Sequence, residues 1–384
     1  MSAKQFFIRS FTMKLHVFNP EHDLALAANL QNFTAPLAGR QLRVDLEFIP
    51  ALWAEEGDAV LVSNEAVAQR CFREFLSSSK LFKHEPFFVT RRQVATLNLE
   101  GVEVWGWDLA IRAQLLRYGI AEHLLPTTDE IDIIRQLSHR RTATRLLAGI
   151  SISGTIGQAF CCTSNDEIER KRQEFQEIVV KAPWSSSGRG VRFFRQQPSA
   201  TQQGWVDNIL RTQGCVMVEP LYKNKVCDFA MEFLTDGCGH TNYLGLSLFH
   251  TVNGAYTGNL VAAEDVKRQM LGDYVFVDIL DKIKEILRCQ TAVLFKGKYK
   301  GLFGIDMMIV GNEATGYWVH PCVELNLRRT MGMLSHQLIA QDHTAMLQLM
   351  SIQCENGQYK LRLKNIDGDH NNEEHNGHYD HYSE

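Results

Sequence analysis

Two neighbouring apolar segments that carry acidic side chains constrain the fold of this chain most strongly. Residues 301–310 form an apolar run with one carboxylate, Asp306, and residues 317–326 carry Glu324 and Asn326 near their end. A buried carboxylate is costly without a cation or strong hydrogen-bond donors. Because side chains alternate along a strand, Glu324 and Asn326 share one face. If the chain reverses between the two segments, Asp306 lies opposite Glu324, and three oxygen ligands converge from two strands.

This oxygen set favours Mg²⁺, which takes few protein ligands and completes its octahedron with phosphate and water. Zinc would require His or Cys side chains, and His320 is the one such residue with ligand spacing on that face. Arg328 has the same parity as Asn326, so its guanidinium can hold the anion that develops during phosphoryl transfer. For Arg329, a surface charge is the alternative. A solvated hairpin, the alternative for the whole segment, is disfavoured by the apolar residues around both carboxylates.

A loop rich in serine and glycine follows the strand predicted at residues 178–181, which ends on Lys181. The apolar segment 191–194 after the loop completes a strand–loop–strand unit. Its N–H groups, its hydroxyls and the charge of Lys181 suit a phosphate group. A Walker loop and the dinucleotide fingerprint both require a helix after the loop, so the β-rich segment excludes both. The alternative is an ordinary flexible hairpin. The loop residues are Ser185, Ser186, Ser187, Gly188, Arg189 and Gly190.

The first part of the chain, residues 13–125, alternates short apolar strands with helical patterns, which predicts a small parallel α/β domain. The strands are predicted at 15–18, 59–62, 87–89 and 102–105, and the helices at 23–30, 66–76 and 107–118. Residues 1–12 are interpreted as an N-terminal extension. His22 and Asp23 follow the first strand, where α/β proteins bind ligands, and are candidate substrate contacts, although a helix start also explains them.

The remainder of the chain predicts a mixed helix and sheet domain over residues 126–350. An amphipathic helix at 129–147 opens it, and antiparallel strands fill 178–326 around one helix at 273–289. A last helix is predicted at 331–350 and a C-terminal segment at 351–363. Residues 364–384, rich in Asn, Asp, Glu, Gly and His, predict a disordered acidic tail.

The composition fits a globular enzyme and argues against several classes of partner. The chain has 384 residues, enough for several packed units, and 45% of them are hydrophobic. The net charge is -4 and the basic residues are dispersed, which argues against nucleic-acid binding. No apolar run reaches the roughly 20 residues that span a bilayer and no signal peptide is evident, so we expect a cytoplasmic protein without a membrane partner. Nine cysteines without a Cys-x-x-Cys pair favour reduced thiols.

In combination, these segments resemble the ATP-grasp superfamily. The resemblance is carried by the lysine-tipped strand with its Ser/Gly loop, the later strand that ends in an acidic residue, and the Asp and Glu-x-Asn-x-Arg strands. Residues 127 to about 350 follow that order. The resemblance implies an α/β and α+β architecture in which two α+β subdomains grip ATP and a small parallel α/β domain precedes them.

The resemblance also assigns ATP contacts by position. Lys181 and the loop residues 185–190 would bind the phosphates. Glu219 would accept a hydrogen bond from the adenine amine, and backbone groups of Leu221 would pair with the ring. Asp228 would contact the ribose, at a position where the superfamily more often has Glu. A further cation for the phosphates would be Arg140 or Arg141.

The same resemblance assigns the metal ligands and the reaction. Asp306, Glu324 and Asn326 match the metal ligands, and Arg328 matches the catalytic arginine near the transferred phosphate. Most members join a carboxylate to an amine through an acyl phosphate. This implies an ADP-forming ligase that uses ATP and Mg²⁺, with two ions and Mn²⁺ as the alternative metal. Its partners would be a small carboxylate and an amine substrate, and the oligomeric state stays open. The alternatives are an ATP-dependent phosphotransferase and an ATP-binding regulatory protein without turnover.

Overall fold

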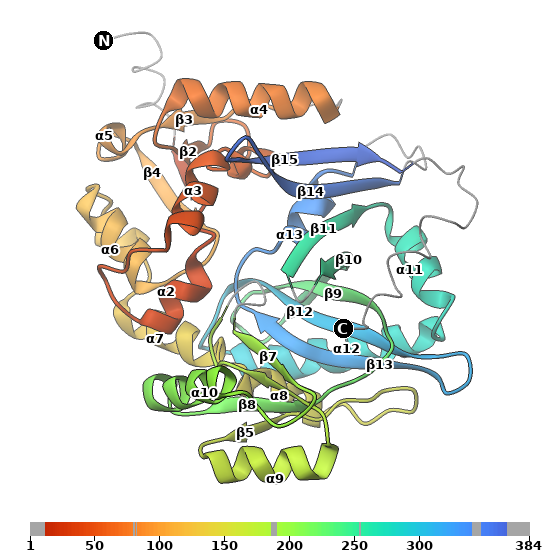
Figure 1. Ribbon diagram of the computed structural model, residues 1–384. Coiled ribbons are helices and arrows are strands. Elements are labelled where there is room, and N and C mark those ends of the chain that lie inside the picture. The colour runs from red at the N-terminus through yellow and green to blue at the C-terminus, as the bar shows by residue number, and fades with distance from the viewer. Residues whose placement is uncertain are drawn as a thin grey trace.

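The computed structural model describes residues 12–79, 81, 83–185, 190–252, 255–339 and 347–366. Three sheets organise this part of the chain (Figure 1). The N-terminal sheet and its helices lie along one side of the molecule, a small sheet lies at the opposite end, and a large sheet runs between them. Within the described residues, no helix is long and apolar enough to cross a bilayer.

The N-terminal domain is built on a parallel sheet of order β3-β2-β1-β4, as the sequence predicted. Its strands are β1 (Met13–Val17), β2 (Ala59–Leu61), β3 (Phe87–Val89) and β4 (Leu99–Val104). Both faces of the sheet are covered, and β2 is apolar on both sides, whereas β1 carries Lys14 and the buried His16 on one face. The helices are α2 (His22–Ala28), α3 (Leu37–Asp45), η1 (Ile49–Leu52), α4 (Glu65–Ser79), α5 (Arg91–Val94), α6 (Leu109–Arg117) and η2 (Glu122–Leu124).

The small sheet is antiparallel and has the order β5-β8-β6-β7. It contains β5 (Phe160–Cys162), β6 (Ile178–Lys181), β7 (Val191–Phe194) and β8 (Val216–Pro220), with helices α9 (Asn165–Phe175) and α10 (Ala200–Gln213). Helix α10 was not predicted, because its sequence is mostly polar. Its start nevertheless carries a capping box in which Ser199 and Gln202 satisfy each other's backbone N–H groups.

The large sheet has seven antiparallel strands in the order β13-β12-β9-β10-β11-β14-β15. The strands are β9 (Lys225–Thr235), β10 (Thr241–Val252), β11 (Ala255–Val261), β12 (Gly301–Asn312), β13 (Gly316–Asn326), β14 (Gln348–Glu355) and β15 (Gln358–Asn365). Its helices are α11 (Glu264–Gly272), α12 (Val277–Phe295) and α13 (Met331–Gln337). The sequence predicted a helix near α12 and a helix that begins, like α13, at residue 331, and it did not predict α11.

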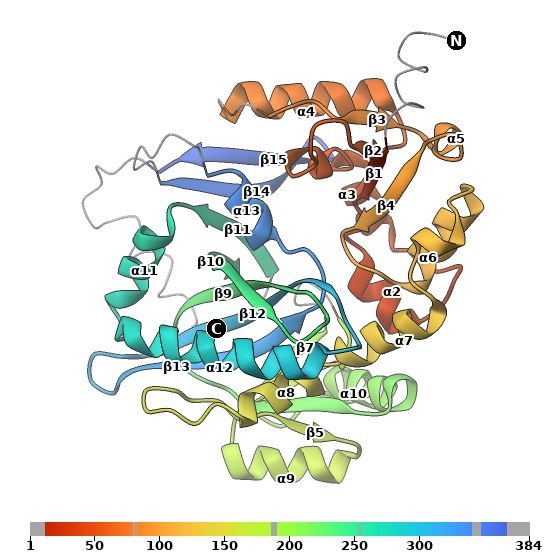
Figure 2. The same cartoon turned by 180° about the vertical axis from the view of Figure 1, so that it is seen from behind.

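Helix α12 determines which face of the large sheet is free for a functional site. It lies across one face, as the view from behind shows (Figure 2). Leu280, Ile283 and Leu287 of α12 pack there against the odd-numbered residues of β12, such as Phe303 and Ile305. Because side chains alternate, the even-numbered residues of β12 point to the opposite face.

The predicted helix at 129–147 is two helices, α7 (Thr128–Leu137) and α8 (Arg141–Ala148). The break has a physical cause in residues 138–140. The Arg140 N–H donates to Pro183 O at 3.2 Å, and the His139 carbonyl accepts from Thr142 N at 2.8 Å, so the chain bends toward the small sheet. The apolar positions continue across the break, which is why the sequence pattern resembled one helix.

The predicted last helix at 331–350 is also wrong. Helix α13 ends at Gln337, and residues 348–365 form the hairpin β14–β15, which extends the large sheet. Met350 and Leu361 of this hairpin pack against Phe72 and Phe75 of α4, so burial against the N-terminal domain favours strands there. The predicted boundary at 350 therefore falls inside β14, and the tail predicted from 364 begins inside β15. Residues 1–11 and 367–384 lie outside the described part of the chain.

Candidate active site

The free face of the large sheet presents its polar side chains in three rows across β9, β12 and β13. Residues paired across antiparallel strands share a face, and rows two residues apart are separated by about 7 Å. The register defines a first row of Asp228, Met308 and His320, a second row of Ala230, Asp306 and Glu324, and a third row of Glu232, Gly304 and Asn326. Between the first two rows, β13 has a bulge at Pro321, a residue that cannot donate to a neighbouring strand.

The predicted metal ligands meet in the second and third rows. Asp306 and Glu324 are direct partners in the register, and the Asn326 Nδ2 donates to Asp306 Oδ2 at 3.0 Å. Burial and the neighbouring Glu324 charge raise the pKa of Asp306 above its ordinary value. Two facing carboxylates destabilise each other's ionised forms, so a cation is needed to keep both of them ionised.

Two arginines flank this carboxylate pair. The Arg140 Nη2 lies 2.8 Å from Glu324 Oε1 and also donates to Ser185 Oγ at 3.1 Å. The Arg328 Nη2 donates to Asn326 Oδ1 at 3.0 Å. Arg140 and Arg328 therefore reach the same carboxylate cluster from α8 and from the segment after β13. Arg141, the other candidate, is exposed on the helix and does not point to this cluster.

Asp23 of the N-terminal domain also reaches the cluster. Its two carboxylate oxygens accept three hydrogen bonds from the Arg328 guanidinium, at 3.0 to 3.2 Å. Burial is the largest single influence on Asp23 and opposes its ionisation, but the charge and hydrogen bonds of Arg328, together with His22 and Arg140, lower the pKa of the carboxyl overall. His22, the neighbouring candidate, is buried instead against Asp108, with its Nδ1 3.2 Å from Asp108 Oδ2. Of the two predicted substrate contacts, Asp23 lies at the cluster, and His22 is part of the domain core.

Lys181 and Glu219 lie across from the first row and contact each other. The Lys181 Nζ donates to Glu219 Oε2 at 2.6 Å, and both side chains are buried. His320 is fully buried near this pair, with its ring 5.5 Å from the Tyr222 ring in an edge-on arrangement. Burial lowers the pKa of His320 to about 4, so its ring is neutral at pH 7. Neither ring nitrogen has a hydrogen-bond partner among the described residues.

Two other predicted nucleotide contacts, Asp228 and Leu221, already have hydrogen-bond partners within the protein. The Asp228 carboxylate accepts from Lys225 Nζ at 2.6 Å and from Thr251 Oγ1. The Leu221 N–H donates to Glu177 O at 3.0 Å, so the backbone carbonyl is the group of Leu221 that is left for pairing with a base in this conformation. Ser185 and Gly190 border the loop, and the remaining predicted loop residues, Ser186, Ser187, Gly188 and Arg189, lie outside the described part of the chain.

Arg329, for which a surface charge was the alternative, is an interdomain contact. Its Nη2 lies 2.8 Å from Glu103 Oε2, and its guanidinium stacks over the Trp53 ring at 4.5 Å. Its backbone N–H donates to Trp105 O at 2.8 Å. Arg329 thus fixes the segment after β13 against the N-terminal domain and leaves Arg328 facing the cluster.

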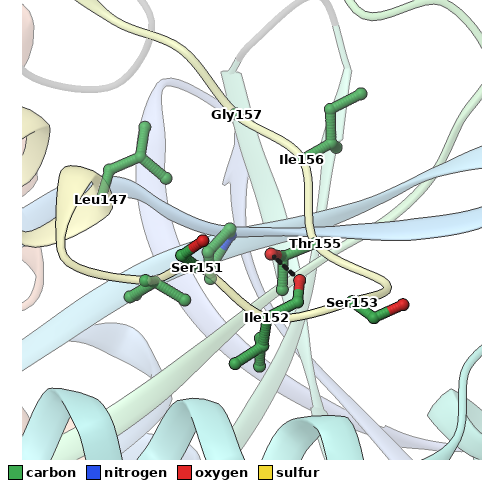
Figure 3. Close-up of a pocket in the computed structure, with 9 residues that line it drawn as sticks. Leu147, Ser151, Ile152, Ser153, Thr155, Ile156 and Gly157 are labelled. Carbon is green, nitrogen blue, oxygen red and sulfur yellow. Dashed lines mark hydrogen bonds between the residues drawn. The ribbon is translucent and has the colours of Figure 1, made fainter.

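A cavity of about 390 Å³ lies outside this cluster. The loop from Leu147 to Gly157 curves around it, and Ser151, Ser153 and Thr155 supply its hydroxyls (Figure 3). The Thr155 hydroxyl is already used, because it donates to Ile152 O at 2.7 Å. None of the predicted site residues lines this cavity. A narrower cavity does touch the cluster, and its lining includes Asp23, Ser185, Glu324 and Asn326.

Glu232 is the polar residue of this face that the sequence analysis missed. It stands in the apolar run Phe229-Ala230-Met231-Glu232-Phe233, which is the same signal that drew attention to Asp306. Its side chain is 1% exposed, and the Thr330 hydroxyl donates to Oε1 at 2.7 Å. Its Oε2 is also buried, without a hydrogen-bond partner among the described residues.

These residues can bind an anion and a divalent cation side by side. The described residues hold no group of three His, Cys, Asp or Glu side chains that would bind a metal. Asp306 and Glu324 supply two hard carboxylates and Asn326 an amide oxygen, which suits an ion that keeps water or phosphate as its other ligands. Arg140, Arg328 and Lys181 supply positive charge beside that ion, which suits the oxygens of a polyphosphate.

Comparison with solved structures places this arrangement among known folds. The chain is similar to a phosphoribosylamine–glycine ligase from Thermotoga maritima, with 12% identity over 90% of this chain and 81% of that chain, and a TM-score of 0.50. A biotin carboxylase in complex with an ATP analogue from Campylobacter jejuni has 12% identity over 90% and 76% of the chains, with a TM-score of 0.48. An N5-carboxyaminoimidazole synthetase from Staphylococcus aureus in complex with ADP has 12% identity over 90% and 84%, with a TM-score of 0.45.

The sequence comparisons, by contrast, found no match. No protein-family model matches this chain, and no curated protein is similar to it in sequence. At 12% identity, the likeness to the glycine ligase shows a shared fold.

Proposed function

We propose that this chain, whose fold is the ATP-grasp fold, is an ADP-forming ligase that joins a small carboxylate to an amine with Mg²⁺ and ATP. The observation that carries the proposal is the pairing of Asp306 with Glu324 in one row, with Asn326 in the next row and Arg140 and Arg328 on either side. A hinge protein that only packs its domains together has no use for two facing carboxylates between two guanidinium groups.

The nucleotide would lie between the small sheet and the free face of the large sheet. Lys181 at the end of β6, the loop residues 185–190 and Arg140 would bind the phosphates. Glu219 would face the base, with the carbonyl of Leu221 beside it. Asp228 would contact the ribose. His320, in the same row as Asp228, would face the nucleoside with a neutral ring.

Asp306, Glu324 and Asn326 would hold Mg²⁺, with Mn²⁺ as the alternative and two ions as the expected number. When bound, the metal would neutralise the β- and γ-phosphate oxygens and orient the terminal phosphoryl group. The raised pKa of Asp306 supports this fit, because a cation would restore the ionised form of a carboxyl that burial and Glu324 disfavour.

In this reaction, the protein positions the substrates and stabilises the charge that develops on the transferred phosphoryl group. A carboxylate oxygen of the first substrate attacks the γ-phosphorus, and ADP leaves with the electrons of the broken P–O bond. The amine nitrogen then attacks the acyl carbon, and phosphate leaves. Arg328 would hold the phosphoryl oxygens through both steps, and Asp23 would keep that guanidinium in place between steps.

The named activity of the glycine ligase supports the same reaction class. Its name describes the joining of phosphoribosylamine to glycine, an amine and a carboxylate. We also propose a cytoplasmic location, because the nine cysteines are all free thiols, which suit a reducing compartment.

The test is ADP release from Mg·ATP with a panel of small carboxylates and primary amines. We expect release that requires one carboxylate and one amine together, and a loss of at least about a hundredfold in Asp306→Asn. A phosphotransferase would instead release ADP with a single acceptor that keeps the phosphate. Tight nucleotide binding without turnover would support the regulatory alternative. Activity that survives Asp306→Asn undiminished would contradict the metal assignment.

A further inference from the structure

The third row of the free face lies on the side of the carboxylate pair that is away from the nucleoside. Along β9, Asp228 stands in the first row, Ala230 opposite Asp306 in the second, and Glu232 in the third. If Asp228 marks the ribose and Asp306 the metal, the row order continues outward to Glu232. If the second substrate meets the terminal phosphate from this side, it lies next to the third row, where Glu232 is buried beneath α13.

Glu232 has one oxygen that the described part of the protein leaves without a donor. Thr330 donates to its Oε1, and Thr330 in turn accepts the Met333 N–H at the start of α13. The Oε2 has no such partner and is buried. Leaving a buried acceptor unsatisfied costs about 1–3 kcal/mol, more for a charged group, so a donor for this oxygen is expected from outside the described residues.

The buried ammonium group of Lys267 does not supply that donor. The Lys267 Nζ donates to Leu246 O at 2.9 Å, and no ion pair joins it to Glu232. The neighbouring hydroxyl of Ser247 accepts from Asn259 Nδ2 at 2.7 Å, and Asn259 accepts from Tyr256. Two buried polar atoms of this cluster have no hydrogen-bond partner among the described residues, the His336 Nε2 and the Glu232 Oε2, and the Glu232 Oε2 is the one that belongs to a carboxyl.

Two glycines make room for the Glu232 carboxyl. A Cβ placed on Gly304, its partner on β12, would lie 2.6 Å from Oε2. A Cβ on Gly332, in the first turn of α13, would collide with Oε1 and with the Ser247 hydroxyl. Any other residue at either position would displace the carboxyl. The protein therefore keeps a carboxyl at this point by using the smallest residue on both sides of it.

We propose that Glu232 is the binding group for the ammonium of the acceptor amine. The inference rests on the proposed ligase function and names the amine subsite of the same active site. A primary ammonium is the donor that completes a lone carboxylate oxygen with a charge-assisted hydrogen bond. It also matches the position one row beyond Asp306.

The same group provides the proton balance that the amine needs before it can attack. An ammonium has no lone pair, so one N–H bond must break first. The proton passes to Glu232 Oε2 and the electron pair stays on nitrogen, which leaves a neutral amine hydrogen-bonded to a neutral carboxyl. The amine then forms the C–N bond to the acyl phosphate while phosphate leaves with the C–O electrons. The second proton that the nitrogen loses passes to the departing phosphate.

The test compares two nucleophiles in Glu232→Gln. Primary amines, from methylamine to amino acids, are largely ammonium ions at pH 8.5, where most of Glu232 is ionised, and they need a carboxylate. Hydroxylamine is neutral at that pH and captures an acyl phosphate as a hydroxamate without such a partner. With the carboxylate and amine that support ADP release in the wild type, we expect the KM for the amine to rise about tenfold to a hundredfold in Glu232→Gln. Hydroxamate formation and Mg·ADP affinity should stay within about twofold.

The matched control is Glu47→Gln. Glu47 is also a buried carboxyl, held by Ser63 in the N-terminal domain and away from the sheet face. Its amine KM should not change, which separates loss of a buried carboxyl from loss of the amine subsite. An amine KM unchanged in Glu232→Gln overturns the inference alone. Equal losses with the amine and with hydroxylamine overturn it too, because they indicate a structural role. Absence of amine-dependent ADP release in the wild type overturns the ligase function and the inference with it.

Discussion

At the scale of single residues, the site is defined by carboxyls that the fold buries against their preference. Burial raises the pKa of Glu232 to about 8, and burial together with Glu324 raises that of Asp306. Arg328 does the opposite for Asp23, whose carboxyl keeps a lowered pKa although it is buried. The three carboxyls belong to one cluster and differ in the positive charge that lies beside each of them. Asp306 and Glu232 have raised pKa values because the positive charge beside them is too small to offset burial, so these are the positions where a positively charged ligand would bind.

The free energy of unfolding should depend on pH because of Glu232, and this dependence should be weaker in Glu232→Gln. Because its folded pKa of about 8 exceeds its unfolded value, the folded state holds the proton more tightly, and stability falls as pH rises from about 5 to 8. The slope is at most about 1.4 kcal/mol per pH unit. We expect Glu232→Gln to flatten this part of the curve, measured by urea unfolding without metal.

Two neighbours set the limits of that measurement. Asp306 adds a slope of the same sign, so the informative quantity is the difference between wild type and variant. Burial lowers the pKa of Lys267 to about 8. Its contribution to the free energy of unfolding therefore increases with pH only above pH 8, outside the range from pH 5 to 8 that tests Glu232. Identical slopes in the two proteins from pH 5 to 8 would show that Glu232 ionises normally.

At the scale of elements, the sequence predicted what local patterns encode and missed what tertiary contacts decide. The hairpin of β12 and β13 and the alignment of Asp306 with Glu324 followed from alternation and one turn, and the structure confirms that register. The break at residues 138–140 depends on Arg140 reaching the small sheet, which no periodicity reveals. The hairpin β14–β15 depends on burial against α4, a contact with residues nearly 280 positions earlier.

The missed Glu232 shows the limit of single signals. A lone acidic residue inside an apolar strand was interpreted at Asp306 because Glu-x-Asn-x-Arg followed in the next strand. At Glu232 no second motif followed, and its relation to Gly304 and Gly332 appears only when β9, β12 and α13 are assembled. The sequence thus grouped Asp306, Glu324 and Asn326 as candidate metal ligands and left out Glu232.

The docking of α13 on the sheet should depend on one glycine. In Gly332→Ala, the added methyl group collides with Glu232 Oε1 and Ser247, so we expect a loss of about 1–3 kcal/mol in the free energy of unfolding. Gly204→Ala is the matched control, because nothing lies near its Cβ within α10 and alanine favours helices. That variant should gain up to about 1 kcal/mol. Equal stability of the two variants, measured by urea unfolding, would argue against close packing at α13.

At the scale of the whole molecule, the N-terminal domain is part of the site through Asp23. The Asp23–Arg328 pair joins residues 305 positions apart, and Arg329 fixes the same segment to Glu103 and Trp105. The alternation of strands and helices predicted a parallel domain followed by antiparallel strands, and the family resemblance implied two subdomains in the second part. The contact that brings an N-terminal carboxylate onto the arginine beside the metal ligands was not predictable, because it depends on how the domains are packed.

A double-mutant cycle of Asp23→Ala and Arg328→Ala should measure this interdomain contact. Both side chains are mostly buried and share three hydrogen bonds, so we expect a coupling of about 1–3 kcal/mol in the free energy of unfolding. The exposed pair Arg73–Glu85 serves as the control and should give less than about 1 kcal/mol. Additive effects at Asp23 and Arg328 would mean that the domains are held together elsewhere.

The most direct test of the central claim is a crystal structure with Mn²⁺ and a non-hydrolysable ATP analogue, in which anomalous scattering locates the metal. The account predicts an anomalous peak within about 2.0–2.4 Å of carboxylate oxygens of Asp306 and Glu324, beside the terminal phosphates, with the base near Glu219. A peak away from these two carboxylates, or a nucleotide bound in the cavity lined by residues 150–157, would contradict it.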